Sequence, residues 1–131
     1  MLCDTNIISE LAKPKPNAGV ILWAEQQHHI ALSVITIEEL QYGLSWKPNP
    51  RIRLWLDNFV QDFCDVLPIT QQVAQVAGDM RGTLQAKGET RTQADMLIAA
   101  TAAVHDLPLI TRNTNDFAGC GIQIINPFSG S

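Results

Sequence analysis

The feature that most constrains the fold is the alternation of short apolar runs with longer helical segments. Residues 30–35 (Ile-Ala-Leu-Ser-Val-Ile) form a nearly continuous apolar run with β-branched residues, which suits a strand covered on both faces. Similar short runs stand at 2–3, 66–69, 109–111 and 122–125. Strands that alternate with helices predict an α/β fold, a three-layer α/β/α sandwich around a mainly parallel sheet with right-handed crossovers.

The intervening segments carry helix signals. Hydrophobic residues recur at mostly helical spacing, and prolines or a glycine mark the ends, as at Pro14, Pro48 and Gly88. Asn17, Thr70 and Thr92 are suitable N-caps. Helices are predicted over residues 7–12, 18–27, 36–46, 51–63, 71–87 and 93–105. Pro68 predicts that the third strand lies at an edge of the sheet.

Length and composition predict a single domain over residues 1–131. The chain of 131 residues is 46% hydrophobic, enough for a layered core. No apolar run approaches the ~20 residues that a membrane span requires, and no secretory leader is recognisable. We therefore expect a cytoplasmic protein without a membrane partner. Its three cysteines have neither disulfide-ladder nor zinc spacing, so we expect reduced, mostly buried thiols.

The formal net charge of −4 argues mildly against a partner as anionic as nucleic acid. Four acids gathered at one metal site would account for all of this charge. Net charge therefore does not decide whether the protein binds nucleic acid.

Four acidic residues stand where a parallel sheet would bring them together. Asp4 and Asp116 follow the ends of two predicted strands, and Glu39 lies in the first turn of the helix after a third. Asp95 opens a nearly all-apolar helix, where an ionised carboxylate without a partner is costly. The carboxyl ends of parallel strands share one rim, where ligands bind. Crowded carboxylates at that rim predict a site for Mg²⁺ or Mn²⁺, which prefer oxygen ligands and can activate water against a phosphodiester.

Each acid also has a structural interpretation. Asp4 could cap the first helix, and Asp116 could form an Asx-turn. Glu39 and Asp95 each lie three residues after a threonine, which is the spacing of a capping box. Helical spacing does not separate Glu39 from its neighbour Glu38, and the capping-box offset favours Glu39 only weakly.

Other polar residues near the predicted rim are secondary candidates. Asn6 could orient Asp4, and Asn113 could replace or join Asp116 as a ligand. Ser33 and Thr111 could bind a phosphate or a metal-bound water, or serve as local caps. Basic residues could line a groove for nucleic acid, or could simply be solvated: Lys13, Lys15, Lys47, Arg51, Arg53 and Arg112. No Ser-His-Asp set, glycine-rich phosphate loop or zinc cluster is recognisable.

Four motifs in order resemble the PIN-domain toxins of VapC/FitB type. The matching stretches are Asp4-Thr5-Asn6-Ile7-Ile8-Ser9-Glu10, Ser33-x-x-Thr36-x-x-Glu39-Leu40-x-x-Gly43, Ala94-Asp95-x-x-Ile98-Ala99-Ala100-Thr101-Ala102 and Thr111-Arg112-Asn113-x-x-Asp116-Phe117. The resemblance covers almost the whole chain and extends to Asn126-Pro127-Phe128.

The resemblance implies a Mg²⁺- or Mn²⁺-dependent endoribonuclease, a homodimer, and inhibition by an antitoxin whose tail occupies the acidic groove. It places the family's first acid on Asp4, its glutamate on Glu39 and its third acid on Asp95. The fourth position falls on Asp116 or Asn113, because some relatives carry an acid where this chain has Asn113.

Two other functions remain open from the residues alone. A non-catalytic PIN-like module would bind RNA or protein without cation-dependent cleavage. A phospho-accepting signalling domain would use Asp4 and Thr111, but it normally needs adjacent acids after strand one and a lysine after the last strand, and the chain has neither.

Overall fold

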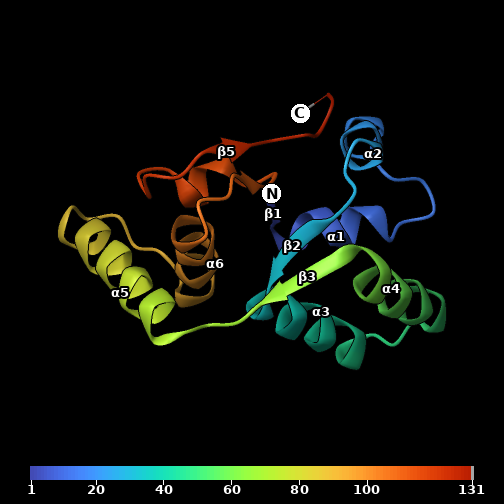
Figure 1. The fold of residues 1–131 in the computed structure, drawn as a ribbon, viewed down its shortest axis with the longest axis horizontal. Coiled ribbons are helices and arrows are strands. Elements are labelled where there is room, and N and C mark those ends of the chain that lie inside the picture. Colours follow the sequence, from blue (N-terminus) through green and yellow to red (C-terminus); the bar gives the residue numbers. More distant parts are fainter. Residues whose placement is uncertain (131) are drawn as a thin grey trace.

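A five-stranded parallel sheet forms the centre of the computed structural model, which describes residues 1–130. The strands lie in the order β3-β2-β1-β4-β5, and every neighbouring pair is parallel. Figure 1 shows β3 beside β2 at one edge of the sheet. Their bounds are Leu2–Cys3 (β1), Ile30–Ser33 (β2), Cys64–Leu67 (β3), Leu109–Ile110 (β4) and Ile124–Ile125 (β5). Because all strands run the same way, their carboxyl ends share one rim. The predicted parallel α/β sandwich is confirmed.

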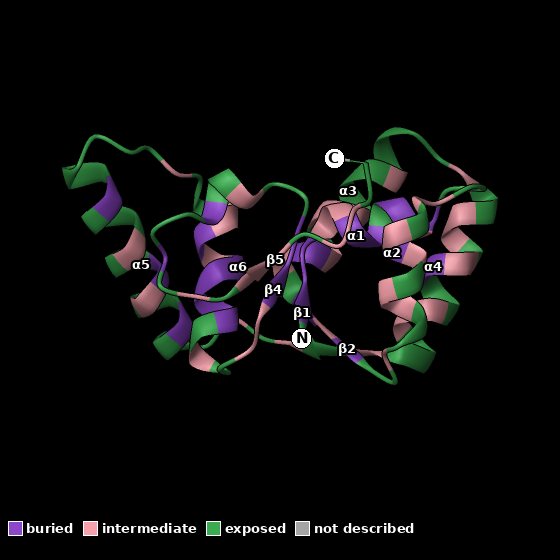
Figure 2. Ribbon diagram, turned by 90° about the horizontal axis from the view of Figure 1, so that it is seen from above, coloured by how far each residue is buried: buried purple, intermediate pink, exposed green. Residues whose placement is uncertain are grey.

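Helices cover both faces of this sheet. Figure 2 shows α5 and α6 on one side and α1, α2 and α4 on the other. The helices span Thr5–Leu11 (α1), Ala18–Glu25 (α2), Val34–Trp46 (α3), Pro50–Phe63 (α4), Gln71–Ala86 (α5) and Gln93–Val104 (α6), with a 3₁₀ turn at Thr114–Phe117 (η1).

The strands feed two separate cores because successive side chains of a strand point to opposite faces. Leu2 and Leu109 pack in the cluster with α5 and α6, whereas Cys3 and Ile110 pack in the cluster with α1, α2 and α4. All four side chains are fully buried. Two residues per strand are therefore enough to anchor both outer layers, which explains how such short strands hold the sheet.

The second strand ends earlier than its apolar run predicts. The run 30–35 was expected to be all strand, but β2 ends at Ser33 and α3 begins at Val34. The reason is a cap, because the Ser33 hydroxyl accepts a hydrogen bond from the Ile35 N–H at 3.0 Å. A helix start at Thr36 was therefore wrong.

The third strand is also shifted from its predicted position. It occupies Cys64–Leu67 rather than 66–69 and follows α4 directly. Pro68 lacks an N–H to donate to a ladder, so pairing stops at Leu67 opposite Ser33. Its position at one edge of the sheet is as predicted.

The predicted helix N-caps and free thiols are confirmed. Asn17, Thr70 and Thr92 are the N-caps of α2, α5 and α6. The three cysteines are free thiols, with Cys3 and Cys120 buried and Cys64 half-buried. None of the helices in residues 1–130 is long and apolar enough to cross a membrane.

Candidate functional site

An open pocket of about 430 Å³ lies at the carboxyl ends of β1 and β4. Residues of α1, α3 and α6 and of the segments that follow β1, α1, β4 and β5 line it: Asp4, Thr5, Asn6, Ser9, Glu10, Lys13, Glu39, Asp95, Arg112, Asn113 and Phe128. Three of the four predicted acids, Asp4, Glu39 and Asp95, therefore reach one pocket, as the common rim of parallel strands requires.

Asp4 is the most firmly held of these acids. It follows β1 and caps α1, since its Oδ1 accepts a hydrogen bond from the Thr5 N–H at 2.8 Å. Its Oδ2 accepts from the Thr111 hydroxyl at 2.8 Å and from Asn6 Nδ2 at 3.0 Å. Burial raises the pKa of Asp4 against these hydrogen bonds, and the negative charge of Glu39 raises it further. The capping role proposed as an alternative is thus real, and the residue also lines the pocket.

Asn6 and Thr111 connect Asp4 to the end of β4. Asn6 Nδ2 also donates to Thr111 Oγ1 at 3.2 Å, and Asn6 Oδ1 accepts from the Arg112 N–H at 3.1 Å. The Thr111 hydroxyl is fully buried and accepts from the Asn113 N–H at 3.0 Å. These contacts fix the carboxylate of Asp4 in one orientation, while a contribution to catalysis stays a prediction.

Glu39 reaches the pocket from inside α3. Because α3 begins at Val34, Glu39 lies beyond its first turn, and the capping-box interpretation is wrong. The Thr5 hydroxyl donates to Glu39 Oε1 at 2.6 Å and lies 3.1 Å from Thr36 Oγ1. Glu38 is exposed and does not line the pocket, so the structure separates two neighbours that helical spacing left undecided.

Asp95 lies in the first turn of α6, next to the cap Thr92. Its N–H donates to the Thr92 hydroxyl at 3.1 Å, as in one half of a capping box. Burial raises the pKa of the Asp95 carboxyl, and the charges of Asp4 and Asp116 raise it further, against a hydrogen bond from Thr92. The capping contact and the electrostatic coupling to the other acids are therefore both present.

Asp116 and Asn113, the two candidates for the fourth position, are placed differently. Asn113 is exposed and lines the pocket. Asp116 is exposed on η1, is not among the pocket-lining residues, and acts on Asp95 through its charge. The backbone carbonyl of Asp116 accepts from Arg91 Nη1 at 2.7 Å. Geometry thus favours Asn113 as a direct pocket contact.

Ser33 is not a pocket residue. It is fully buried and caps α3, which was its structural alternative, so the structure lends no support to a role in the site.

Of the basic candidates, only Lys13 and Arg112 line the pocket. Lys13 pairs with Glu10 at 2.8 Å, whereas Lys15 is exposed and outside the pocket lining. Arg51 Nη2 donates to the Ala12 carbonyl at 2.9 Å, which accounts for it without a ligand.

The oxygen-only donor set suits a hard cation better than zinc. Within residues 1–130, however, no three His, Cys, Asp or Glu side chains are grouped so that they could hold an ion in common. The three acids line one pocket, where the charge of Glu39 raises the pKa of Asp4 and the charge of Asp4 raises the pKa of Asp95. The carboxylate chemistry of Asp4, Glu39 and Asp95 nevertheless fits a divalent cation.

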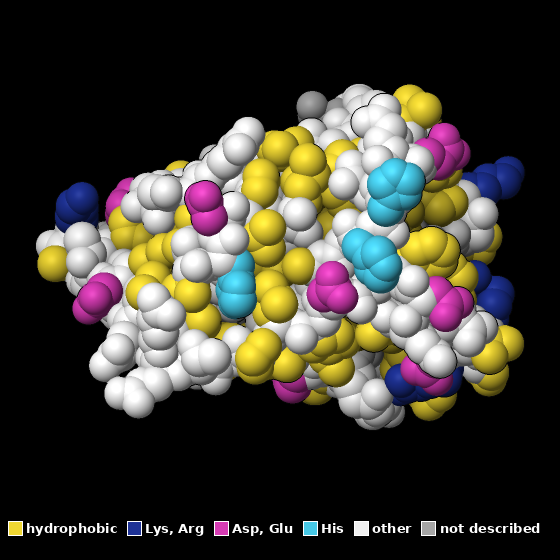
Figure 3. Space-filling model, in the orientation of Figure 1, with side chains coloured by type: hydrophobic (Ala, Val, Ile, Leu, Met, Phe, Trp, Pro, Cys, Tyr) yellow, Lys and Arg dark blue, Asp and Glu magenta, His cyan; other side chains and the backbone are white. Residues whose placement is uncertain are grey.

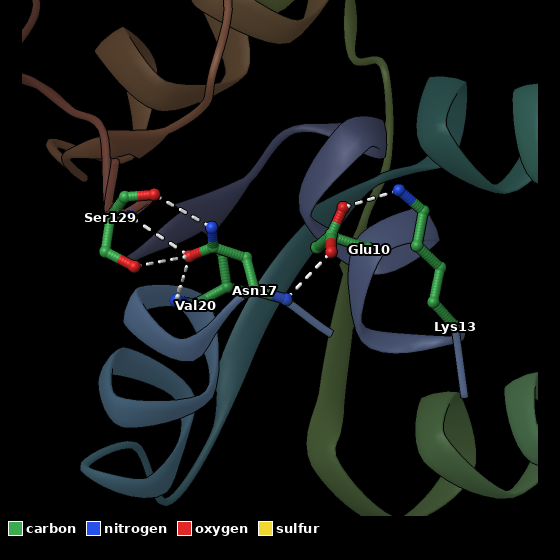
Figure 4. Close-up of polar contacts among 5 residues, drawn as sticks. All are labelled: Glu10, Lys13, Asn17, Val20 and Ser129. Carbon is green, nitrogen blue, oxygen red and sulfur yellow. Dashed lines mark hydrogen bonds and ion pairs between the residues drawn. The ribbon is translucent and has the colours of Figure 1, made fainter. Parts of the chain in front are cut away.

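Four further residues at the pocket were given no role from the sequence: Thr5, Ser9, Glu10 and Phe128. Glu10 is buried and accepts from Lys13 Nζ and the Asn17 N–H, each at 2.8 Å (Figure 4). Phe128 comes from the segment after β5. Thr5, Ser9 and Glu10 all lie in the first of the four motifs that carry the family resemblance, and Phe128 lies in the stretch at its end.

The parallel α/β fold and the acid-lined pocket indicate the class of protein to which the chain belongs. A comparison with known protein families identifies this class. The sequence matches the PIN domain family over residues 1–119, so the chain belongs to the PIN-domain family.

Individual members of this family are similar to the chain over nearly its full length. The chain is 33% identical to VapC ribonuclease Y4jK of Sinorhizobium fredii, covering 98% of this chain and 97% of that protein. It is 31% identical to the toxin FitB of Neisseria gonorrhoeae, covering 98% of both. Its structure is similar to that of a toxin–antitoxin complex from Klebsiella pneumoniae, with a TM-score of 0.74, 29% identity and 98% coverage of each chain.

Proposed function

We propose that the protein is the ribonuclease toxin of a type II toxin–antitoxin pair and that it hydrolyses RNA phosphodiester bonds with a bound divalent cation, Mg²⁺ or Mn²⁺. The observation that carries this proposal is the convergence of Asp4, Glu39 and Asp95, from three separate elements, on one open pocket. The VapC and FitB relatives extend over nearly the full chain and support the same activity.

Asp4, Glu39 and Asp95 would hold the cation once its positive charge brings their carboxylates closer together than they lie in the structure. Asp4 is kept in place by three hydrogen bonds, and Glu39 is held by the Thr5 hydroxyl. A bound divalent cation lowers the pKa of water and polarises a phosphodiester. Asp116 would add negative charge beside Asp95, and Asn113 would offer an amide to the substrate.

The pocket is open, so an RNA backbone could lie across it without a lid having to move. We further propose an antitoxin as the protein partner, by analogy with the toxin–antitoxin complex whose structure the chain resembles. We propose a homodimer on the same family resemblance.

The decisive experiment is RNA cleavage by the purified protein with Mn²⁺, with Mg²⁺ or with a chelator. Cleavage should require the cation, and Asp4→Asn or Glu39→Gln should each reduce it at least ~100-fold, since even residues that only support metal ligands cost about 10–100-fold. Glu38→Gln is the matched control, because Glu38 is the exposed neighbour of Glu39 on α3 and should leave the rate unchanged.

The ends of the products test the route. Attack by water leaves a 5′-phosphate and a 3′-hydroxyl, whereas attack by the ribose 2′-hydroxyl leaves a 2′,3′-cyclic phosphate. A cyclic product, or equal loss of activity in Glu38→Gln and Glu39→Gln, would contradict the proposal. RNA binding without any cleavage under all three conditions would instead favour the non-catalytic PIN-like module.

A further inference from the structure

A segment far from Asp4, Glu39 and Asp95 in sequence contributes one residue, Phe128, to the acid-lined pocket. Residues 126–129 follow β5 and return to the start of α2, where Asn17 holds Ser129 (Figure 4). Asn17 Nδ2 donates to the Ser129 carbonyl at 2.9 Å, and Asn17 Oδ1 accepts from the Ser129 N–H at 3.0 Å. The residue that caps α2 therefore also fixes segment 126–129.

Close packing at Gly19 shows that this docking is specific. A Cβ atom at Gly19 would lie 2.3 Å from the Pro127 carbonyl oxygen and 2.7 Å from the Ser129 nitrogen. Gly19 N–H also donates to the Ser129 hydroxyl at 3.1 Å. Only glycine allows the segment to lie this close to α2.

The docked segment presents Phe128 to Arg112. The Arg112 guanidinium carbon lies 4.7 Å from the centroid of the Phe128 ring, and both residues line the pocket. This is a cation–π contact, which restricts the guanidinium while leaving its N–H edge free to donate. The backbone N–H of Arg112 donates to Asn6, and the side chain of Asn6 also donates to Asp4.

Arg112 has no carboxylate partner among the ion pairs of residues 1–130, which are Lys13–Glu10 and Arg53–Asp57. The pocket's other cation, Lys13, is already engaged by Glu10. Arg112 is thus the positive group at this site that is available to a ligand, and its neighbours in the pocket are acids that repel a phosphate.

We propose that Arg112 binds a phosphate of the RNA strand beside the acids, and that Phe128, docked through Asn17 and Gly19, positions it. The inference rests on the proposed function because it assigns a contact to the same substrate. A guanidinium can offer two parallel N–H groups to a phosphate, and restricting it beforehand by a contact with an aromatic ring reduces the entropy lost on binding. Arg112 is the binding residue, and Phe128 and Gly19 act through it.

The test is equilibrium binding of a fluorescein-labelled single-stranded RNA of mixed sequence, measured by anisotropy in chelator so that cleavage does not contribute. Arg112→Ala should weaken binding about tenfold. It should also reduce the slope of log K against log salt by about 0.7, the value for one phosphate contact on a single strand. Phe128→Leu should produce a smaller loss, Phe128→Tyr should restore binding, and Phe128→Leu added to Arg112→Ala should change nothing further.

A second pair of variants distinguishes the effect of docking segment 126–129 from a general loss of stability. Gly19→Ala should displace the segment and reduce the salt slope, whereas Gly78→Ala, a helical glycine whose added Cβ would meet no atom within 4 Å, should not. Thermal unfolding of both variants checks that they fold.

The inference is overturned if Arg112→Ala leaves the salt slope unchanged, or if Phe128→Leu and Arg112→Ala act additively. If the wild type binds RNA through Arg112 but never cleaves it with any cation, the proposed function fails and this inference stands. If the wild type cleaves RNA and Arg112→Ala binds RNA as the wild type does, the proposed function stands and this inference fails.

Discussion

The two ends of the sheet carry pockets of opposite character. At the carboxyl end, the acid-lined pocket gathers Asp4, Glu39 and Asp95. At the amino end of β2, a pocket of about 250 Å³ is mainly apolar, with Trp23, Phe59 and other side chains lining it. Figure 3 shows hydrophobic side chains across the middle of one face, with histidine side chains beside them.

The apolar pocket belongs to the part of the molecule that stabilises the fold, whereas the acid-lined pocket holds the residues proposed for the chemistry. The apolar pocket is continuous with the core of α1, α2 and α4, to which Trp23, Ile30 and Phe59 all contribute. At the acidic rim, burial and neighbouring charges raise the pKa of Asp4 and Asp95, so ionisation there opposes folding. Packing at the apolar end of the sheet stabilises the folded protein, whereas the gathered negative charges at the acidic end destabilise it.

The largest effect on stability is expected at the apolar end. Ile30→Ala removes a side chain that is 5% exposed and should lower the free energy of unfolding by about 2–5 kcal/mol. Chemical denaturation measures this, and Leu22→Ala, at a residue 61% exposed on α2, is the control and should change it by less than ~0.5 kcal/mol. If Ile30→Ala changed the free energy of unfolding as little as Leu22→Ala does, the apolar end would not be the stabilising end of the sheet.

Thr5→Val tests how the acidic rim is held together. It keeps the shape of the side chain but removes the hydroxyl that donates to Glu39, so cation affinity should fall by about 10–100-fold. A Mn²⁺ titration followed by thermal unfolding measures the affinity, and Thr5→Ser should retain it. If valine and serine behave alike, the hydroxyl does not orient Glu39.

Cation binding itself should stabilise the protein through the acidic rim. Mg²⁺ at about ten times its Kd should raise the free energy of unfolding of the wild type by about 1.4 kcal/mol, and that of Asp95→Asn by less. Without cation, Asp95→Asn should be at least as stable as the wild type because it removes a repelled charge. Equal cation-induced shifts in both proteins would refute a shared site.

The smallest effect concerns pH in the metal-free protein. The pKa of Asp95 is raised in the folded state, so the unfolded state releases its proton first as pH rises from the ordinary aspartate value of 3.8. Stability is therefore greatest below that value and falls as pH rises through the folded-state pKa. Asp95→Asn should make this decline shallower in denaturation curves measured in chelator, and Asp79→Asn, an exposed site on α5, should not.

Local signals predicted most of the framework. The alternation of apolar runs and helical periodicity indicated the parallel sandwich, and polar caps such as Asn17 and Thr92 marked where helices begin. Boundaries failed where a cap competed with a strand-like run, as at Ser33. There a single side-chain hydrogen bond outweighed the β propensity of the residues after it.

The candidate site was predicted in its acids and not in its supporting contacts. Glu39 could not be chosen over Glu38 by helical angle, because the choice depends on where α1 places Thr5. The sequence favoured Asp116 for the fourth position and left Asn113 as its alternative, whereas the structure places only Asn113 at the pocket.

The sequence by itself determined that acids stand after strand ends or in the early turns of helices, because strand, turn and helix propensities depend on neighbouring residues. The tertiary structure alone decided which of these acids meet, since it set the strand order and brought Thr111 to Asp4 across 107 residues. It also decided that Phe128 would stand beside Arg112. Such contacts join segments that carry no local information about one another, and only the packing of both cores onto one twisted sheet brings them within hydrogen-bonding distance.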